Sequence, residues 1–572
     1  MEIMKLIFHG IGMFYECENL EQLPDLTKDT NGYNIKALEK LRSIEEAFYG
    51  TAITSLELNY FQNAKILSNV DSAFEKCENL KAINKDLFKN CDGILHFEAT
   101  FKNTGLLAIP EELFYGNINV LTFKESFYGC KYIEEVPKNL FKNNKKVTKF
   151  ESTFENCSGI KKIYDELFVN NVDVTAFYNT FYGCKNLSKI PPNLFNKNIN
   201  VIGFRQVFAS CINIPEIPAN LFKTNVQAEE FQGLFRDCVK IEEIPPNLFE
   251  TNVNATAIRG VFSGCTNIKE IPEILFKNNI NVTDFSSLFS NCTSITEIPS
   301  SLFASNKKVE VFSDVFSATT ITTIDKNIFA SSKQNINYLD GAFKNCMKFK
   351  LDSITHKEMF ANYESVTDFS EIFYATGVDI IPERLFLNCI NATKFEKSFA
   401  YTALKSIDSS FWGNNPNIKN VAEMFKGCYY LESVNSYNGK GVFHNLNKIT
   451  NMEFVFGNCL ALNSVYSNTF KGCTSVEKIG GAFYKCSNLQ NLGYNALDDM
   501  KNSLTTISVK KYEGDWIYYY GIFQQCSSLP KANCPPLYDW PAFSTYDTHT
   551  YNAFYGTGYF DQDSMWSKYI RK

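Results

Sequence analysis

Apolar and polar positions follow one another along most of the chain in an order that returns at nearly constant length. The segment NVTDFSSLFSNCTSITEIPSSLF, residues 281–303, shows one period, with Phe, Cys, Ile-Pro and Leu-Phe in that order. The Phe that precedes the Cys by three residues, here named the ladder Phe, recurs every 27 residues at Phe127, Phe154, Phe181, Phe208, Phe235, Phe262, Phe289, Phe316 and Phe343. A catalytic motif normally occurs once, so a motif that returns many times indicates a structural repeat.

The ladder Phe can be followed outward to both ends of the chain. It stands at Phe14, Phe48, Phe74 and Phe101, and later at Phe373, Phe399, Phe425, Phe456, Phe483, Phe523 and Phe554. After Phe343 the intervals become 30, 26, 26, 31, 27, 40 and 31 residues, so insertions accumulate there. We therefore predict about twenty coils, mostly of 26–27 residues: a regular solenoid over 1–372 with an N-terminal cap, and a continuation over 373–572 with irregular, insertion-bearing coils and an aromatic C-terminal cap.

Each coil is predicted to contain a short strand followed by a helical turn. The segment SITEIP has apolar residues at Ile295 and Ile298 and ends at Pro299, which cannot donate to a sheet ladder. Pro is also favoured at the first position of a helix, so Pro299 opens the turn. Other coils place Asp165, Asp325 or Asp408 at this position, where Asp can cap the turn.

The rest of the coil predicts a second short helix. Val282, Phe285, Phe289 and Cys292 are spaced by three and four residues, as in a one-sided amphipathic helix. One such coil cannot bury its own apolar face, so neighbouring coils must stack in parallel. The 51 Phe residues amount to about two and a half per coil, which predicts an aromatic core.

Three segments carry a family resemblance. IGGAFYKCSNLQNLG (479–493), FSGCTNIKEIP (262–272) and NVTDFSSLFSNCTSI (281–295) resemble the BspA-like leucine-rich repeats of bacterial surface proteins, with their A-F-x-x-C-x-x-L-x-x-I-x-I-P pattern, and related repeats with N-V-T-x-M-x-x-M-F-x-x-C. The match extends over roughly residues 10–560. The resemblance implies an α/β leucine-rich-repeat solenoid that serves in binding: adhesion to host proteins or other cells, and surface recognition in some phage and protist relatives. The chain departs from this family in using IPxxLF where the usual step is LDLS.

Composition narrows the expected partners and location. The net charge is -6 and the pI is near 5.7, and the chain shows no basic stripe, so we do not expect a nucleic-acid partner. No window approaches 18 uninterrupted apolar residues, so membrane insertion is not expected. The N-terminal MEIMKLIFHGIGMF lacks a basic n-region and is interpreted as a cap rather than a signal peptide. The resemblance favours the cell surface or a virion, with a protein or cell-surface glycan as partner.

The cysteines follow the repeat. Fourteen of the 18 stand three residues after a ladder Phe, and six coils have Thr there: Thr51, Thr104, Thr319, Thr376, Thr402 and Thr557. In the Thr coils the next apolar residue comes one position sooner, as a comparison of Cys292 and Ile295 with Thr319 and Ile321 shows. The choice between Cys and Thr at this position therefore follows the local backbone geometry rather than the reactivity of sulfur. We expect the cysteines to be small, buried residues with free thiols. A disulfide ladder between adjacent coils is the alternative, because stacked positions come within disulfide range.

Other candidate chemistry is repetitive or isolated. The chain has no C-x-x-C pair and its five His are scattered, so no metal site or cofactor is expected; Cys91 and His96 are interpreted as two residues on a turn. The triplets SGC, GNC and KGC lack a companion His, which argues against nucleophilic catalysis. Glu pairs such as Glu134-Glu135 fall between the apolar residues of the strand, on a solvated face. We therefore do not expect an enzyme.

Aromatic residues mark the candidate binding region. Insertions in solenoids often lie on a functional face, and Tyr and Trp provide large contact areas. The longest insertion and the C-terminal tail concentrate such residues, and the candidate partner-binding residues are Trp516, Tyr518, Tyr519, Tyr520, Trp540 and Tyr559. The alternative is that they form a cap over the last coil. Two functions remain open: a non-catalytic binding or adhesion solenoid, and a structural or receptor-recognition component of a phage virion or other assembly.

Overall fold

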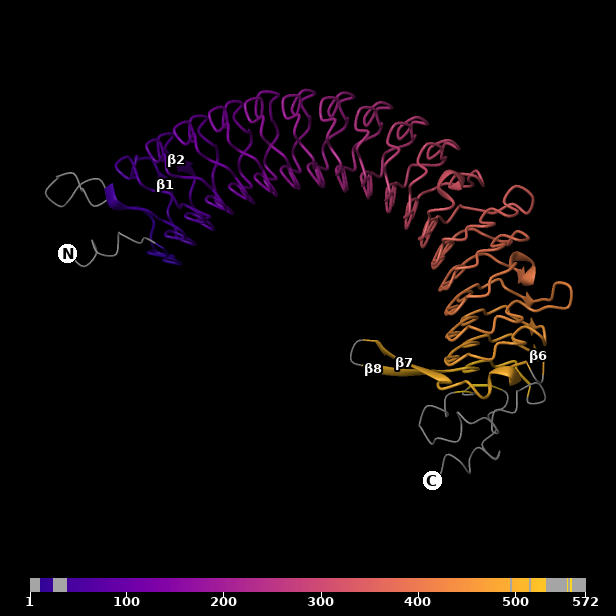
Figure 1. Ribbon diagram of the computed structural model, residues 1–572. Coiled ribbons are helices and arrows are strands. Elements are labelled where there is room, and N and C mark those ends of the chain that lie inside the picture. Colours follow the sequence, from indigo (N-terminus) through magenta and orange to yellow (C-terminus); the bar gives the residue numbers. More distant parts are fainter. Residues whose placement is uncertain are drawn as a thin grey trace. The chain divides into compact units, whose positions relative to one another are not determined.

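The structure, a computed structural model, describes residues 11–23, 39–493, 496–513, 516–530, 553 and 556–557. It divides into two compact units, Met1–Ile295 and Thr296–Lys572, which are described separately. In each unit consecutive coils stand side by side (Figure 1). Most of the two predicted caps, and the last predicted coil at Phe554, fall outside the described residues.

Short parallel strands lie where the sequence predicts them. In the first unit β1 (Ser55–Leu56) pairs with β2 (Ala82–Ile83). In the second unit four strands form a parallel sheet in chain order: β3 (Ser406–Ile407), β4 (Ser433–Val434), β5 (Ser464–Val465) and β6 (Asn491–Leu492). The register joins equivalent residues of neighbouring coils, so that Val434 faces Val465. Each strand occupies the position of Glu297-Ile298, and the predicted parallel strand is confirmed in these coils.

In coils that end in Ile-Pro, the Pro explains why no full strand forms at this position, whereas the coils of Tyr164 and Asp325 have neither Pro nor a full strand. None of the six strands is followed by Pro, and the next residue completes the ladder: Asn84 N donates to Leu56 O over 2.7 Å, and Tyr466 N donates to Val434 O over 2.9 Å. Coils that end in Ile-Pro, such as that of Pro299, lack this N–H donor. The Pro residue begins a turn instead, in which Leu302 N donates to Pro299 O over 3.1 Å.

Asp caps the turn, as predicted, in the coils of Asp325 and Asp408. The predicted cap at Asp165 is wrong, because Tyr164 opens that turn, with Leu167 N donating to Tyr164 O over 3.2 Å, and the Asp165 carboxylate accepts from Asn193 N of the next coil over 2.7 Å. The short 3-10 helix η4 (Ser409–Phe411) begins after Asp408, whose carboxylate accepts a hydrogen bond from Ser410 N over 2.7 Å. The Asp325 carboxylate accepts one from Asn327 N over 2.7 Å. Two further 3-10 helices are η3 (Ala330–Ser332) and η5 (Asp498–Met500).

The predicted second helix is wrong. The segment equivalent to 282–292 forms linked turns, and the described residues contain no α-helix. Within a coil, Cys265 N donates to Phe262 O over 3.0 Å, three residues back. Every second backbone N–H of this segment donates instead to the next coil. Gly260 N donates to Ser286 O over 2.8 Å, and Phe262 N donates to Leu288 O over 3.1 Å. We name this stacked segment, from five residues before to three after each ladder Phe, the turn ladder.

Backbone conformation separates the turn ladder from a helix. The residues two before and two after a ladder Phe have left-handed φ, as at Gly260 (60°) and Gly264 (76°) around Phe262. A left-handed residue interrupts a right-handed helix. Five residues before each ladder Phe, single parallel bridges link the coils, for example Lys149 to Ala176. The spacing of three and four residues arises because two successive turns direct Val, Phe, Phe and Cys inward.

The predicted aromatic core is confirmed. In the first unit the ring of Phe235 is fully buried and stacks 6.0 Å from Phe208 and 6.2 Å from Phe262, with interplanar angles of 6° and 11°. In the second unit Phe343 stacks 6.1 Å from Phe316 and 5.7 Å from Phe373. Additional Phe columns pack against the ladder Phe at a tilt. The hydrophobic burial of these rings is therefore shared between neighbouring coils.

The ladder cysteines are small buried hydrogen-bond donors. All described cysteines are free thiols, and all except Cys17 are buried. Each buried ladder thiol lies against the ladder Phe carbonyl of the preceding coil, as in Cys157 Sγ to Phe127 O over 2.9 Å. In a Thr coil the hydroxyl takes a similar role within its own coil, as in Thr104 Oγ1 to Phe101 O over 2.9 Å. The prediction of a small buried residue at this position is confirmed.

A second buried ladder, made of asparagines, was missed by the sequence analysis. These residues stand three after the Leu-Phe pair at Asn117, Asn144, Asn171, Asn198, Asn225, Asn252 and Asn279 in the first unit, and at Asn306 and Asn415 in the second, where Phe411-Trp412 replaces Leu-Phe before Asn415. Asn171 Nδ2 donates to Phe141 O over 3.2 Å and to Asn144 O over 2.8 Å. Cys91, Cys389 and Cys473 occupy the same position in other coils. The side chain thus satisfies buried carbonyls where two turns meet.

Replacing Asn171 by Ala is expected to lower the free energy of unfolding by about 2–4 kcal/mol, because two buried carbonyls lose a donor while the unpartnered Asn171 Oδ1 is also removed. Asn171→Cys should cost less, since Cys473 Sγ bonds to Phe443 O over 3.2 Å at the same position of its coil. Urea unfolding of both variants measures the difference. Equal losses would show that hydrogen bonding is not the role of this side chain.

Candidate binding surface

Aromatic side chains gather on the turn ladder of the second unit, where one is exposed (Tyr429), one is buried (Phe454) and the others are partly exposed. Six consecutive coils contribute one residue each, and we name the set the aromatic row: Tyr374, Tyr401, Tyr429, Phe454, Tyr484 and Tyr520. They stand within four residues of their ladder Phe, and the position directly after the ladder Phe is also Tyr in some coils of the first unit, as at Tyr128 and Tyr182. Stacking of the coils therefore brings together residues that are far apart in the sequence.

Edge-to-face contacts connect the rings within the aromatic row. Tyr401 lies 5.4 Å from Tyr374 and 6.3 Å from Tyr429, at interplanar angles of 68° and 64°. Tyr484 lies 6.2 Å from Phe454 at 90°. Such geometry is favoured by the quadrupole of aromatic rings. The row therefore has a defined arrangement before any partner binds.

A β-hairpin meets the aromatic row at one end. The strands β7 (Ser508–Glu513) and β8 (Trp516–Gly521) pair antiparallel within the 40-residue interval between Phe483 and Phe523 (Figure 1). Tyr520, at the base of the hairpin, lies 5.3 Å from Phe454 and 4.9 Å from Tyr484, both edge-to-face. The longest insertion is thus attached to the row through one of the residues that the sequence analysis selected.

The other sequence-predicted residues are placed only in part. Trp516, Tyr518 and Tyr519 lie in β8, in register with Glu513, Lys511 and Lys510. Trp540 and Tyr559 lie outside the described residues. Their role in binding stays a prediction.

The sequence analysis missed the five members of the row other than Tyr520. It interpreted the surrounding segment as a helix and so did not locate its exposed face. The available signal was an aromatic residue close to the ladder Phe but outside the buried positions of the repeat, in six consecutive coils.

Two members of the row have strained backbones. Tyr401 (φ 60°) and Phe454 (φ 54°) are the aromatic residues with left-handed φ in the described part of the chain. Bulky side chains rarely adopt this conformation, and such residues cluster at functional sites. The Phe454 ring also lies close to Gly481, where an added Cβ would come within 2.5 Å of the ring. Gly481 is therefore needed for the Phe454 ring to lie over the next coil.

Basic side chains flank the rings. Lys426 Nζ lies 4.8 Å from the centre of the Phe454 ring, and Lys485 Nζ lies 5.1 Å from that of Tyr484. Lys426 also pairs with Glu423 over 2.9 Å. Burial, followed by the neighbouring phenols of Tyr374 and Tyr429, raises the pKa of Tyr401 to about 12. The Tyr401 hydroxyl therefore remains a hydrogen-bond donor at neutral pH.

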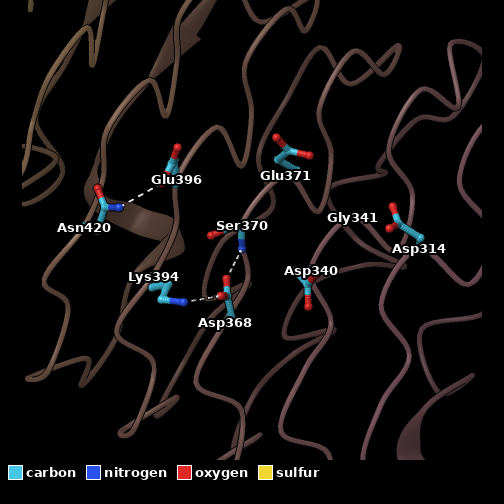
Figure 2. A pocket seen from close by; sticks show the side chains of 9 residues that line it. All are labelled: Asp314, Asp340, Gly341, Asp368, Ser370, Glu371, Lys394, Glu396 and Asn420. Carbon is cyan, nitrogen blue, oxygen red and sulfur yellow. Dashed lines mark hydrogen bonds and ion pairs between the residues drawn. The ribbon is translucent and has the colours of Figure 1, made fainter. Parts of the chain in front are cut away.

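An acidic pocket lies on the turn ladder of the same unit (Figure 2). Its volume is about 310 Å³, and its lining comprises Asp314, Asp340, Gly341, Asp368, Ser370, Glu371, Lys394, Glu396 and Asn420. Lys394 pairs with Asp368 over 3.0 Å, and Asn420 Nδ2 donates to Glu396 over 3.0 Å. In the part of the chain that the structure describes, no group of three or more His, Cys, Asp or Glu side chains could hold a metal ion.

Two carboxyls of the acidic pocket lie in surroundings that disfavour their ionised form. Burial is the largest cause that raises the pKa of Asp314, with added repulsion from Asp340 and Glu371, while Lys344 opposes the shift. Burial likewise raises the pKa of Asp340, against a hydrogen bond from Ser313 Oγ over 2.6 Å. A cationic group brought into the pocket would stabilise both ionised carboxylates.

Comparison with known families agrees with the repeat geometry. A family model described as a BspA-type leucine-rich-repeat region of six copies matches residues 10–120. The chain carries BspA-type leucine-rich repeats. A second model, described as a Mycoplasma protein of unknown function, matches residues 256–379 and 391–508. The leucine-rich-repeat solenoid predicted from the sequence is thereby confirmed, and this fold indicates a protein-binding or recognition role.

Solved structures similar to this leucine-rich-repeat chain share little sequence with it. A leucine-rich-repeat protein from Bacteroides ovatus is 16% identical over 74% of this chain and 86% of its own, with a TM-score of 0.27. Toll, in its complex with Spatzle from Drosophila, is 14% identical over 73% of this chain, with a TM-score of 0.36, and the match spans about half of Toll (52%). TLR13, solved in complex with ssRNA13, is 11% identical over 80% of this chain and 89% of its own, with a TM-score of 0.24.

No curated protein matches the chain. Among the described residues, no helix has the length and apolar character needed to cross a membrane.

Proposed function

We propose that this leucine-rich-repeat protein is a non-catalytic recognition module that binds a protein on another surface through the aromatic row. The observation that carries the proposal is the collection of five exposed or partly exposed tyrosines within six consecutive coils, with the buried ring of Phe454 packed against Tyr484 and Tyr520. Tyr and Trp dominate binding hot spots, and preorganised rings lose little entropy on binding. Adhesion to a cell surface or a virion is the setting that the family resemblance favours.

The charges around the aromatic row favour a particular partner chemistry. The acidic pocket suits an Arg or Lys side chain, since a cation would relieve the repulsion among Asp314, Asp340 and Glu371. The row itself suits an apolar or aromatic anchor. A protein segment that presents both groups fits better than a nucleic acid, whose phosphates the pocket would repel. A cell-surface glycan is the second candidate, because its hydroxyls could use the Tyr401 and Tyr484 phenols.

Replacing Tyr484 by Ala is expected to weaken capture of the partner at least about tenfold, because hot-spot truncation costs more than 1–2 kcal/mol. Tyr182→Ala is the matched control: Tyr182 also directly follows its ladder Phe and is also partly exposed, but it lies in the first unit. The measurement is binding of purified variants to intact target cells or virions, followed by crosslinking and mass spectrometry of the captured molecule.

Equal losses in Tyr484→Ala and Tyr182→Ala, or no loss in either, would contradict the assignment to the aromatic row. Capture that is abolished by deglycosylation of the target but not by its proteolysis would identify a glycan partner.

The hairpin gives a separate prediction. Replacing Trp516 and Tyr519 in β8 by Ala is expected to abolish capture of the partner while the melting temperature stays nearly unchanged, since the hairpin is an insertion outside the ladder of coils. Differential scanning calorimetry and the same binding assay measure both quantities. A large fall in melting temperature would show that these aromatics form a cap instead.

A further inference from the structure

An exposed aliphatic band runs along the first unit, far in sequence from the aromatic row. It occupies the positions one and four residues after the buried asparagine ladder. The exposed members at the first position are Ile118 (54%), Val172 (45%), Ile199 (54%), Val226 (42%), Val253 (44%) and Ile280 (52%), and those at the second are Leu121 (38%) and Ile202 (44%). Because the coils stack, these side chains follow one another along one face, without interruption from Val172 to Ile280 in the first column and with Lys145 between Ile118 and Val172. We name it the aliphatic band.

Hydrogen bonds between coils hold the band in a regular array. Backbone bonds connect equivalent residues of its second column, with Thr175 N to Thr148 O at 2.9 Å, Ile202 N to Thr175 O at 2.8 Å and Glu229 N to Ile202 O at 2.8 Å. Between the columns, Asn200 Nδ2 donates to Val172 O over 3.1 Å, and Asn254 Nδ2 to Val226 O over 3.1 Å. β-Branched side chains have few rotamers, so the surface is also stiff at the side-chain level.

The size of the band matches an interface between proteins. Contiguous exposed apolar patches on single chains mark interaction sites. The two columns and the polar column between them provide three positions in each coil from Ile118 to Thr283, which approaches the roughly 20–30 residues per side of a standard interface. Lost rotamer entropy would be small, since the band consists mainly of Ile, Val, Thr and Asn.

We propose that the aliphatic band binds a second copy of this chain, with the coils of the two copies running antiparallel. The charges of the band select this arrangement. Lys145 and Lys146 stand together in one coil, Asp173 stands in the next, where the proposed axis places it opposite Asn200, and Glu229 stands three coils after the lysines. A two-fold axis between the coils of Val172 and Ile199 places each lysine pair opposite the partner copy's Glu229 coil, twice in the same interface.

The same axis also pairs the apolar members. It places Val172 opposite Ile199 at the centre, and Ile118 opposite Val253 toward the ends. A parallel arrangement would instead place Lys145 and Lys146 opposite the same residues of the second copy. That juxtaposition of like charges disfavours the parallel pairing.

Sedimentation equilibrium of the full chain tests the proposal. The wild type is expected to form dimers in the micromolar to millimolar range, and Ile199→Asp is expected to raise the dissociation constant at least about tenfold, because two carboxylates enter the centre of an apolar interface. Ile274→Asp is the matched control, since Ile274 is exposed to a similar extent (55%) but lies off the band. Far-ultraviolet circular dichroism verifies that both variants are folded.

Charge exchange tests the antiparallel register. Glu229→Lys alone, and Lys145→Glu with Lys146→Glu, are each expected to weaken the dimer, whereas combining all three substitutions restores it. A wild type that remains monomeric throughout this range would overturn the proposal, as would a dimer unaffected by Ile199→Asp. A dimer sensitive to Ile199→Asp but not restored by charge exchange would overturn the antiparallel register. Capture by the aromatic row is measured separately, so the two proposals can fail independently.

Discussion

Replacing Phe235 by Ala is expected to lower the free energy of unfolding by about 3–5 kcal/mol, the usual cost of truncating a buried Phe. Phe235 is fully buried and stacks between Phe208 and Phe262 at 6.0 and 6.2 Å. The cavity would remove ring contacts on both sides at once. Since neighbouring coils stabilise one another in a solenoid, the coils of Phe208 and Phe262 are expected to loosen as well.

Urea unfolding measures the loss in Phe235→Ala, and hydrogen exchange measures the loosening of the adjacent coils. Phe235→Leu should cost less because it keeps more of the side-chain volume. Arg236→Ala, next in the chain and exposed, should change the free energy of unfolding by no more than about 0.5 kcal/mol. A loss below about 1 kcal/mol in Phe235→Ala, or exchange confined to its own coil, would contradict the shared aromatic core.

Stability is expected to fall steeply at alkaline pH because of the buried thiols. Burial raises the pKa of Cys77, Cys130, Cys346 and Cys428 to about 11 and that of Cys91, Cys292, Cys389 and Cys473 to about 12, from an ordinary value of 9.0. Burial also raises the pKa of Cys157 and Cys184 well above that value. A thiol whose pKa is raised by folding is kept protonated in the native state.

The sign of the effect follows from proton linkage. Below the ordinary thiol pKa of 9.0 the native and unfolded states bind the same protons, and the stabilisation is fully present. Above it the unfolded chain loses protons that the native chain retains, so stability falls until the pH passes the native pKa. Each buried thiol contributes up to about 1.4 kcal/mol per pH unit in this range. With many such thiols in each unit, the total slope is large.

Urea midpoints between pH 7 and pH 11 test this expectation within the range set by the shifted thiol pKa values. The matched variant is Cys157→Ser with Cys184→Ser, in which the hydroxyls can still donate to the carbonyls of Phe127 and Phe154. Above the ordinary thiol pKa, the free energy of unfolding of this variant should fall less steeply with pH, because about two fewer protons are released on unfolding. Identical slopes in the variant and the wild type would show that ionisation of these thiols does not limit alkaline stability.

Much of the fold could be predicted because it depends on residue type at repeated positions. The 27-residue interval between Phe208, Phe235 and Phe262 indicated the aromatic core, and the structure stacks these rings. Pro and Asp at the start of the Leu-Phe turn indicated where that turn begins. Burial of the ladder cysteines followed from their exchange with Thr. In each case the cause is local or is repeated in every coil, so it can be recognised without the neighbouring coil.

Of the aromatic row, the sequence analysis predicted only Tyr520, at the base of the hairpin. The insertion around Trp516 and Tyr520 was visible because it breaks the period and is rich in aromatics. The remaining members of the aromatic row, from Tyr374 to Tyr484, occur once per coil among many other Tyr residues. Only the stacking of coils shows that they occupy one face.

The sequence by itself determined the period, the apolar positions that form the core and the position of the short strands. Tertiary structure alone decided the conformation between Val282 and Cys292, because a helix and a turn ladder bury the same residues at the same spacing. The choice depends on the hydrogen-bond partner of alternate N–H groups. Gly260 and Phe262 find theirs on Ser286 and Leu288 of the next coil, and no local pattern reveals a partner that exists only after the coils have stacked.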